Sequence, residues 1–138
     1  MKRRLSILVW ILVLVLIAAH TALAQGAVTG TVTAVDKYGN AILDLITQTL
    51  LDSGFEFGDV ISIEVPGATL EAPFVTAYSE VEVGRALVRG PGGEVAANVI
   101  LAINMGSFAQ TYGVEEGTLV VLSLGEKAGS LGIILPER

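Results

Sequence analysis

The chain has 138 residues, of which fourteen are acidic and eight basic, and it contains one histidine and no cysteine. The absence of cysteine excludes disulfides, a thiolate metal cluster and a lipid-modified cysteine. A net charge of −6 opposes binding to a phosphate backbone or an anionic membrane surface, so we expect no nucleic-acid partner.

The first 24 residues have the pattern of a secretory signal. Met1–Arg4 is basic, Leu5–Ala19 is apolar apart from Ser6, and Ala22–Ala24 has the small-x-small form of a cleavage site. We therefore expect export to the periplasm or cell exterior, with cleavage near Ala24. The alternative is an uncleaved anchor, because the apolar run is nearly the length of about 20 residues that a bilayer requires. We expect contact with the membrane only through this segment, and only if it is not cleaved.

Cleavage would leave one domain, residues 25–125, followed by a tail, residues 126–138. The signal also contains the histidine, His20, so the remainder has five basic residues against all fourteen acidic ones, a formal charge of −9. Without histidine or cysteine, this part cannot build a Ser-His-Asp or Cys-His site, a zinc cluster or a haem ligand set. We expect no catalytic residues, no metal site and no resident cofactor.

The first elements after the signal form a hairpin and a helix. Ala27–Asp36 alternates small or apolar side chains with threonines, which indicates a half-buried strand. Lys37–Asn40 provides turn residues, and Ala41–Leu45 is a second strand pattern. Ile46–Asp52 has apolar residues at helical spacing, and Ser53-Gly54 ends it as a helix C-terminus.

Short β-branched runs follow, separated by glycine, proline or acidic turn residues. The predicted strands are Val60–Val65, Phe74–Tyr78, Arg85–Arg89, Asn98–Ile103 and Thr118–Leu124. Pro66-Gly67 and Gly90–Gly93 are predicted turns, the second one a hairpin turn, and Ser107–Tyr112 is a predicted helical turn. About seven short strands with one or two short helices predict an all-β sandwich or barrel.

Two stretches are candidate sites. In Asp36–Asn40, Tyr38 would offer a ring face and Asn40 a donor and an acceptor to a purine edge. The alternative is a purely structural turn, in which Asp36 and Asn40 bind their own backbone and Gly39 supplies a positive φ.

The second stretch is Leu101–Gln110, which passes from a strand pattern into the helical turn. Asn104 or Ser107 would serve as a helix N-cap, a structural role sufficient to explain either residue. Alternatively, backbone N–H groups at this helix start would meet a polar ligand. The residues themselves leave both interpretations open.

Three blocks together resemble a known family. They are GTVTAVDKYGNAILDL (Gly30–Leu45), VTAYSEVEVG (Val75–Gly84) and LAINMGSFAQTYGVEEGTLVVLSL (Leu101–Leu124). They resemble the C-terminal domain of the S-adenosylmethionine hydroxide adenosyltransferase and halogenase (chlorinase, fluorinase) family. The resemblance implies a Greek-key β-barrel that docks its ligand face on a neighbouring subunit within a trimer. By position, it implies an adenosine-type site made by Tyr38, Asn40, Asn104 and Met105.

The sequence also departs from that family. The larger catalytic N-terminal domain has no counterpart, and Gly90–Gly93 replaces the family's N-S-x-G loop, which holds the amino-acid end of the ligand. The module further resembles the front part of exported proteins with a tyrosine-phosphatase-like domain. We therefore expect an exported, non-catalytic binding or assembly module, with S-adenosylmethionine or adenosine as its possible ligand and a separate catalytic domain or further copies as partner. The alternatives are an S-adenosylmethionine-cleaving enzyme with a site between subunits and a structural front module.

Overall fold

A computed structural model describes residues 26–91 and 93–125 of the chain. The expected signal segment, residues 1–24, and the expected tail, residues 126–138, lie outside the described residues, so both stay predictions. Within the described ranges, no helix has the length and apolar character needed to cross a membrane.

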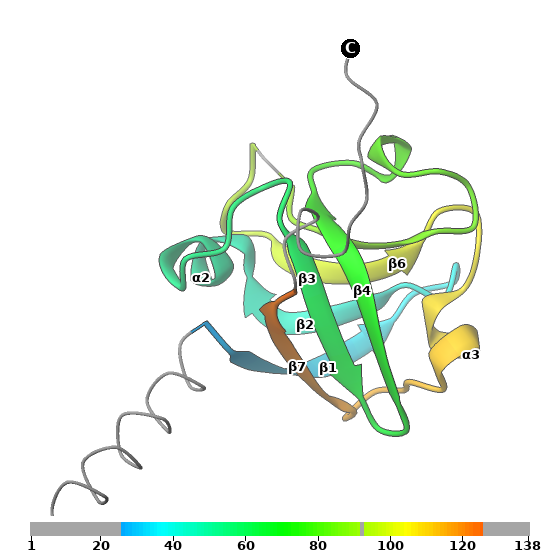
Figure 1. The fold of residues 1–138 in the computed structure, drawn as a ribbon. Coiled ribbons are helices and arrows are strands. Elements are labelled where there is room, and N and C mark those ends of the chain that lie inside the picture. The colour runs from blue at the N-terminus through cyan, green and yellow to red at the C-terminus, as the bar shows by residue number, and fades with distance from the viewer. Residues whose placement is uncertain (1–25, 92, 126–138) are drawn as a thin grey trace, which may run out of the picture.

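Seven strands close into a barrel in the order β1-β2-β6-β5-β4-β3-β7 (Figure 1). Their bounds are β1 Val28–Val35, β2 Ala41–Ile46, β3 Val60–Val65, β4 Ala68–Val75, β5 Ala86–Arg89, β6 Asn98–Ile103 and β7 Leu119–Leu124. All neighbours pair antiparallel except β4 and β5, which are parallel. β7 returns to lie between β3 and β1, a Greek-key type of connection. The prediction of a small all-β barrel is confirmed.

Two short helices and one 3-10 turn complete the fold. They are α2 Thr47–Asp52, α3 Phe108–Tyr112 and η1 Tyr78–Glu80. The helices at 46–52 and 107–112 were predicted. Ser107 is the N-cap of α3, since its hydroxyl accepts a hydrogen bond from Gln110 N at 3.1 Å, whereas Asn104 does not cap this helix.

The barrel interior is filled by the inward side chains of every strand. In β1 and β3, buried and more exposed positions alternate, as the sequence pattern required. The largest fully buried side chains of this interior cluster are Phe55, Phe74, Phe108, Leu43, Leu50, Ile61, Ile63, Leu101 and Leu122. Burial of each such side chain contributes about 1.5–3 kcal/mol.

The predicted strand at Phe74–Tyr78 is wrong in its bounds. The turn at Pro66-Gly67 is a two-residue hairpin, because Val65 pairs directly with Ala68, so β4 begins immediately and already ends at Val75. The chain then bends into η1, where Thr76 N and Ala77 N both donate to the Glu80 carboxylate at 2.7 Å. These donors satisfy backbone groups that a longer strand would have paired.

The segment from Thr76 to Arg85 runs over the outside of the barrel. Val75, Leu87 and Ala102 form a small second cluster on the outer face of β4, β5 and β6, and Tyr78 and Val81 pack against it. This outer cluster fixes the position of Tyr78. The predicted hairpin turn that starts at Gly90 lies in the connection between the antiparallel strands β5 and β6.

Candidate functional site

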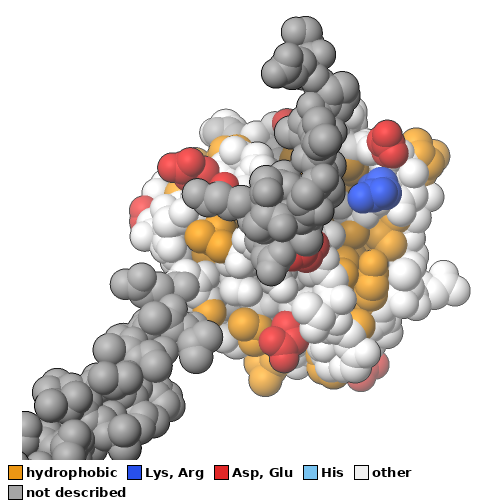
Figure 2. All heavy atoms as spheres, in the orientation of Figure 1, with side chains coloured by type: hydrophobic (Ala, Val, Ile, Leu, Met, Phe, Trp, Pro, Cys, Tyr) orange, Lys and Arg blue, Asp and Glu red, His pale blue; other side chains and the backbone are white. Residues whose placement is uncertain are grey.

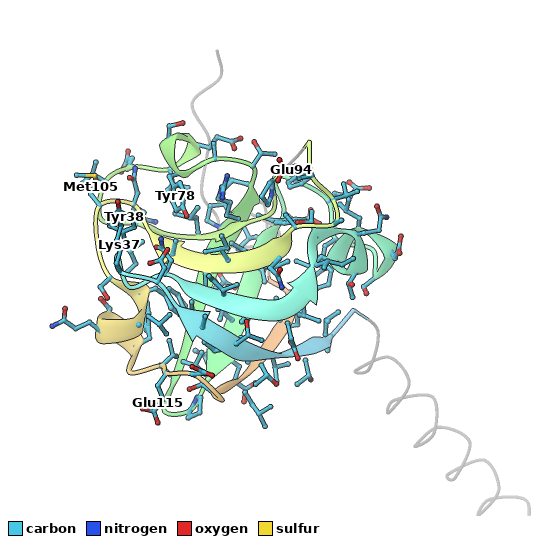
Figure 3. The ribbon with its side chains drawn as sticks, turned by 180° about the vertical axis from the view of Figure 1, so that it is seen from behind. Lys37, Tyr38, Tyr78, Glu94, Met105 and Glu115 are labelled. Carbon is cyan, nitrogen blue, oxygen red and sulfur yellow. The ribbon has the colours of Figure 1, made fainter. Side chains whose placement is uncertain are left out.

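One cleft of about 660 Å³ lies at the end of the barrel where β1 passes to β2 and β6 passes to α3. Figure 3 shows Tyr38, Tyr78 and Met105 at this same end. The four residues predicted from the sequence, Tyr38, Asn40, Asn104 and Met105, all line it. The other lining residues are Asp36, Tyr78, Ile103 and Gly106. The fold thus brings together two segments that are more than sixty positions apart in the chain.

The first wall is the turn Asp36–Asn40, which is held by its own hydrogen bonds. Asp36 Oδ1 accepts from Tyr38 N at 2.8 Å and from Asn40 N at 3.0 Å, and Asn40 Nδ2 donates to Asp36 Oδ2 at 2.9 Å. Burial raises the pKa of Asp36, but the hydrogen bonds from Asn40 and Tyr38 outweigh it and hold the pKa below its ordinary value. Asp36 therefore binds the backbone of its own turn as the structural interpretation predicted, whereas the Asn40 side-chain amide binds the Asp36 side chain and no backbone group of the described residues.

Asn40 nevertheless keeps one group for the cleft. Its side chain is only 6% exposed, and the Asp36 carboxylate fixes the amide orientation because a carboxylate can only accept. No described residue donates to Asn40 Oδ1. Every fully buried side-chain oxygen in the described ranges has a hydrogen-bond partner, so Oδ1, which has none, is not fully buried. The amide oxygen therefore reaches the cleft as an open acceptor.

Gly39 ties this turn to α3. Its φ is +82°, and a Cβ at this position would lie 2.6 Å from Ser107 Cβ, so only glycine fits. Ala109 N donates to Gly39 O at 2.9 Å. The turn and the start of α3 therefore form one packed unit.

The second wall is the turn Ile103–Gly106. Asn104 Nδ2 donates to Val81 O at 2.9 Å, while its backbone binds Gly84 N at 2.7 Å and Arg85 O at 3.0 Å. Asn104 thus joins the turn to the outer segment. The next residue, Met105, has a φ of +59° and is 86% exposed.

Two tyrosines face the cleft from different segments. Tyr38 is 65% exposed, and Lys37 Nζ lies 4.9 Å from its ring centroid. Tyr78 is half-buried, the Arg89 guanidinium lies 5.1 Å from its ring centroid, and its hydroxyl lies 3.5 Å from Asn40 Nδ2. Both cations lie within the distance of a cation–π contact.

Tyr78 was not among the predicted site residues. The signal that identifies it is the T-x-Y-x-x-V-x-x-G stretch from Thr76 to Gly84. This stretch is part of the family resemblance, but the resemblance implied no ligand contact for it. Its side chain reaches the cleft only because the outer segment crosses over β5 and β6.

The lining is suited to binding a flat, partly polar molecule. It offers two phenol rings, an exposed methionine and an open amide acceptor, in a volume within the range of about 300–1,000 Å³ that small-molecule sites occupy. Residues 26–91 and 93–125 contain no group of three side chains able to hold a metal ion together.

Comparison with known proteins gives a family match and similar solved structures, among them the following two. A family model described as "SAM hydroxide adenosyltransferase C-terminal domain" matches residues 30–121, more than half of the chain. No curated protein matches the sequence. An uncharacterized conserved protein from Thermotoga maritima is 27% identical, with a TM-score of 0.65, and the match covers 70% of this chain and 36% of that one.

A conserved hypothetical protein from Thermus thermophilus is 30% identical, with a TM-score of 0.48, and the match covers 72% of this chain and 36% of that one. The chain therefore spans little more than a third of the length of either solved protein.

Proposed function

Because the chain belongs to the family of the S-adenosylmethionine hydroxide adenosyltransferase C-terminal domain, we propose that it is an exported, non-catalytic module that binds an adenosine-type ligand in this cleft. The observation that carries the proposal is the convergence of Tyr38, Asn40, Asn104 and Met105 on one cleft. The proposed ligand contacts rest on the chemistry of those side chains.

The purine would lie against the tyrosines and be recognised by Asn40. Adenine carries an amino group that donates, and Asn40 Oδ1 is an acceptor held in one orientation by Asp36. Tyr38 leaves most of its ring exposed at the cleft, where a flat base stacks well. Neutral recognition of this kind needs no metal and no titrating group.

A partner would close the cleft. Several exposed side chains around it are apolar: Met105 is 86% exposed and Tyr38 65%, and Val83, beside the Gly84 that binds Asn104, is 72% exposed. Exposed apolar groups clustered around a site are typical of a surface that another chain covers. We propose that a further copy of the chain or a separate catalytic domain completes the site.

Calorimetric titration with adenosine tests the ligand. Stacking on an aromatic side chain contributes about 1–3 kcal/mol per base, so Tyr38→Ala should weaken adenosine binding about 5- to 150-fold. The melting temperature of this variant should stay near that of the wild type, because Tyr38 is largely exposed. Leu119→Ala, which removes a 61% exposed side chain on β7 outside the cleft, is the matched control and should bind as the wild type does. No wild-type binding at millimolar adenosine would exclude the proposal.

Incubation with S-adenosylmethionine tests the non-catalytic part. The purified protein should release neither adenosine nor methionine at enzyme-like rates. Turnover at about 1 per second or faster would contradict a binding role and favour an enzyme with its site between subunits. Repeating the assay across protein concentrations would show whether such activity depends on self-association.

A further inference from the structure

The basic residues of the barrel gather around the cleft. Residues 26–91 and 93–125 contain three Lys or Arg residues, namely Lys37, Arg85 and Arg89. Acidic side chains, by contrast, are spread over the surface. On the face shown in Figure 2 the Lys and Arg atoms lie at a single place, with an acidic side chain beside them. Such a distribution places all the described cations in one region of an otherwise negative protein.

The three cations do not line the cleft themselves, but each lies next to a residue that does. Lys37 precedes Tyr38 on the first wall, and its ammonium lies over the Tyr38 ring. Arg89 lies over the Tyr78 ring and donates from Nε to Thr76 O at 3.2 Å, which leaves its remaining N–H groups for other partners.

Arg85 adjoins the second wall. Asn104 N donates to Arg85 O, which places Arg85 opposite Asn104 one step beyond the Ala86–Ile103 pair. Ala86 packs on the barrel core and Leu87 on the outer cluster, so by the period of two Arg85 lies on the outer side with Leu87. Directly opposed side chains begin about 4.5–5.5 Å apart, within easy reach for an arginine.

Two acidic groups near the cleft are bound within the protein, whereas a third, Glu82, is exposed in the outer segment, where its carbonyl accepts from Arg85 N at 3.1 Å. The Asp36 carboxylate accepts hydrogen bonds from Asn40 and Tyr38, and the Glu80 carboxylate accepts from Thr76 and Ala77. Neither carboxylate is paired with one of the three cations. Among the described residues, none of the three cations forms a side-chain hydrogen bond with a carboxylate, and charge-assisted contacts with an external anion are stronger than neutral ones. Because the ionised Asp36 itself lines the cleft, the anionic group would lie on the side of the three cations.

We infer that the ligand of the cleft is an anionic purine nucleotide rather than a neutral nucleoside. This inference rests on the proposed function: the base occupies the Tyr38–Asn40 side, and the phosphate faces the positive side formed by Lys37, Arg85 and Arg89. The overall negative charge of the domain, taken alone, predicts that a neutral nucleoside binds better than an anionic nucleotide. The two expectations are therefore opposite and can be tested against each other. Without the local cations, an anionic ligand would be repelled.

Parallel titrations with adenosine, AMP and inorganic phosphate test it. At low ionic strength, AMP should bind at least about tenfold more tightly than adenosine, the gain expected from one or two charge-assisted hydrogen bonds. This preference should shrink as salt is raised from about 0.01 M to about 1 M, since the Debye length falls from about 30 Å to about 3 Å. Phosphate alone should bind only weakly, because it lacks the base.

Charge variants locate the effect. Lys37→Gln and Arg85→Gln should each lower the ratio of AMP to adenosine affinity about threefold or more, and the double variant should bring it close to one. Leu119→Glu lowers the net charge by the same amount at an exposed position of β7 that does not line the cleft, and it should leave the ratio unchanged. Arg89 is not the variant of choice, because it also holds Thr76.

The outcomes separate the two ideas. If adenosine binds but AMP binds no better, or if the AMP preference grows with salt, the anionic-ligand inference is wrong and the adenosine site stands. If neither ligand binds, both fail. A ratio that falls equally in Leu119→Glu would mean that net charge, and not the three residues near the cleft, sets the preference.

Discussion

The two turns that face each other across the cleft both use a positive φ, but for different reasons. At Gly39 the left-handed conformation brings the backbone against Ser107, where a side chain would not fit. At Met105 the same region of φ is occupied by a long side chain that is 86% exposed. The first turn is built for packing, whereas the second one presents a side chain.

Substitution of the left-handed residue should change the free energy of unfolding in opposite directions in the two turns. A left-handed residue other than glycine costs about 1–2 kcal/mol, and at Met105 the exposed side chain recovers little of this by packing. Glycine in the Ile103–Gly106 turn would be less strained. We therefore predict that the Met105 side chain makes contacts outside the chain, while the close packing on Ser107 is enough to explain Gly39.

The largest expected effect is at Gly39. Gly39→Ala combines a left-handed alanine with a contact 2.6 Å from Ser107 Cβ, so it should lower the free energy of unfolding by about 3 kcal/mol. Gly67→Ala is the matched control, because Gly67 has the same φ of +82° with nothing within 4 Å, and it should cost only about 1 kcal/mol. Urea unfolding of both variants measures the difference. Equal losses would mean that the turn is not clamped on Ser107.

Asn40 comes next. Asn40→Ala removes the buried amide that donates to Asp36, so we expect a loss of about 1–3 kcal/mol in unfolding free energy as well as weaker adenosine binding. The exposed amide of Asn98, which donates to Leu43 O, is the matched control, and Asn98→Ala should cost less. An unchanged melting temperature in Asn40→Ala would show that the amide supports the ligand and not the turn.

Met105 tests the comparison from the other side. Met105→Gly should raise the unfolding free energy by about 1 kcal/mol by relieving the left-handed conformation, while ligand or partner binding weakens. Thermal unfolding and adenosine titration of the same sample give both quantities. If Met105→Gly loses stability and keeps full binding, the side chain serves the fold, and the contrast between the two turns disappears.

The smallest effect is a pH dependence at the first turn. The folded pKa of Asp36 is lowered, so its contribution to stability is present above the ordinary value of 3.8 and is lost as pH falls through the folded pKa. Asp36→Asn should therefore lose less stability than the wild type between about pH 5 and about pH 2. Denaturant unfolding across this range measures both slopes. Equal slopes would contradict the role of the Asp36 carboxylate.

Most of the barrel was predictable because alternation with turn residues is a local signal. The predicted bounds of β3 and β6 match the structure to the residue. The prediction failed at β4, where Pro73 and the flat pattern of Ala68, Leu70 and Ala72 concealed a strand that pairs through a tight hairpin. Local patterns could not supply that pairing, because it depends on the neighbouring strand.

The site was predictable only in part. The family resemblance named Tyr38, Asn40, Asn104 and Met105, which periodicity alone left as turn or cap residues, and their role as ligand contacts stays a prediction. Tyr78 was missed because its position depends on the outer cluster of Val75, Leu87 and Ala102. That cluster forms only when β4, β5 and β6 lie side by side, so no local sequence pattern predicts it.

The most direct test of the central claim is a heteronuclear NMR titration of the protein with adenosine. The amide signals of Gly39, Asn40, Met105 and Gly106 should shift together and saturate with one dissociation constant, while those of the β3–β4 hairpin at Pro66-Gly67 should stay in place. Shifts confined to residues outside the cleft, or no shifts at millimolar adenosine, would contradict a purine site at this end of the barrel.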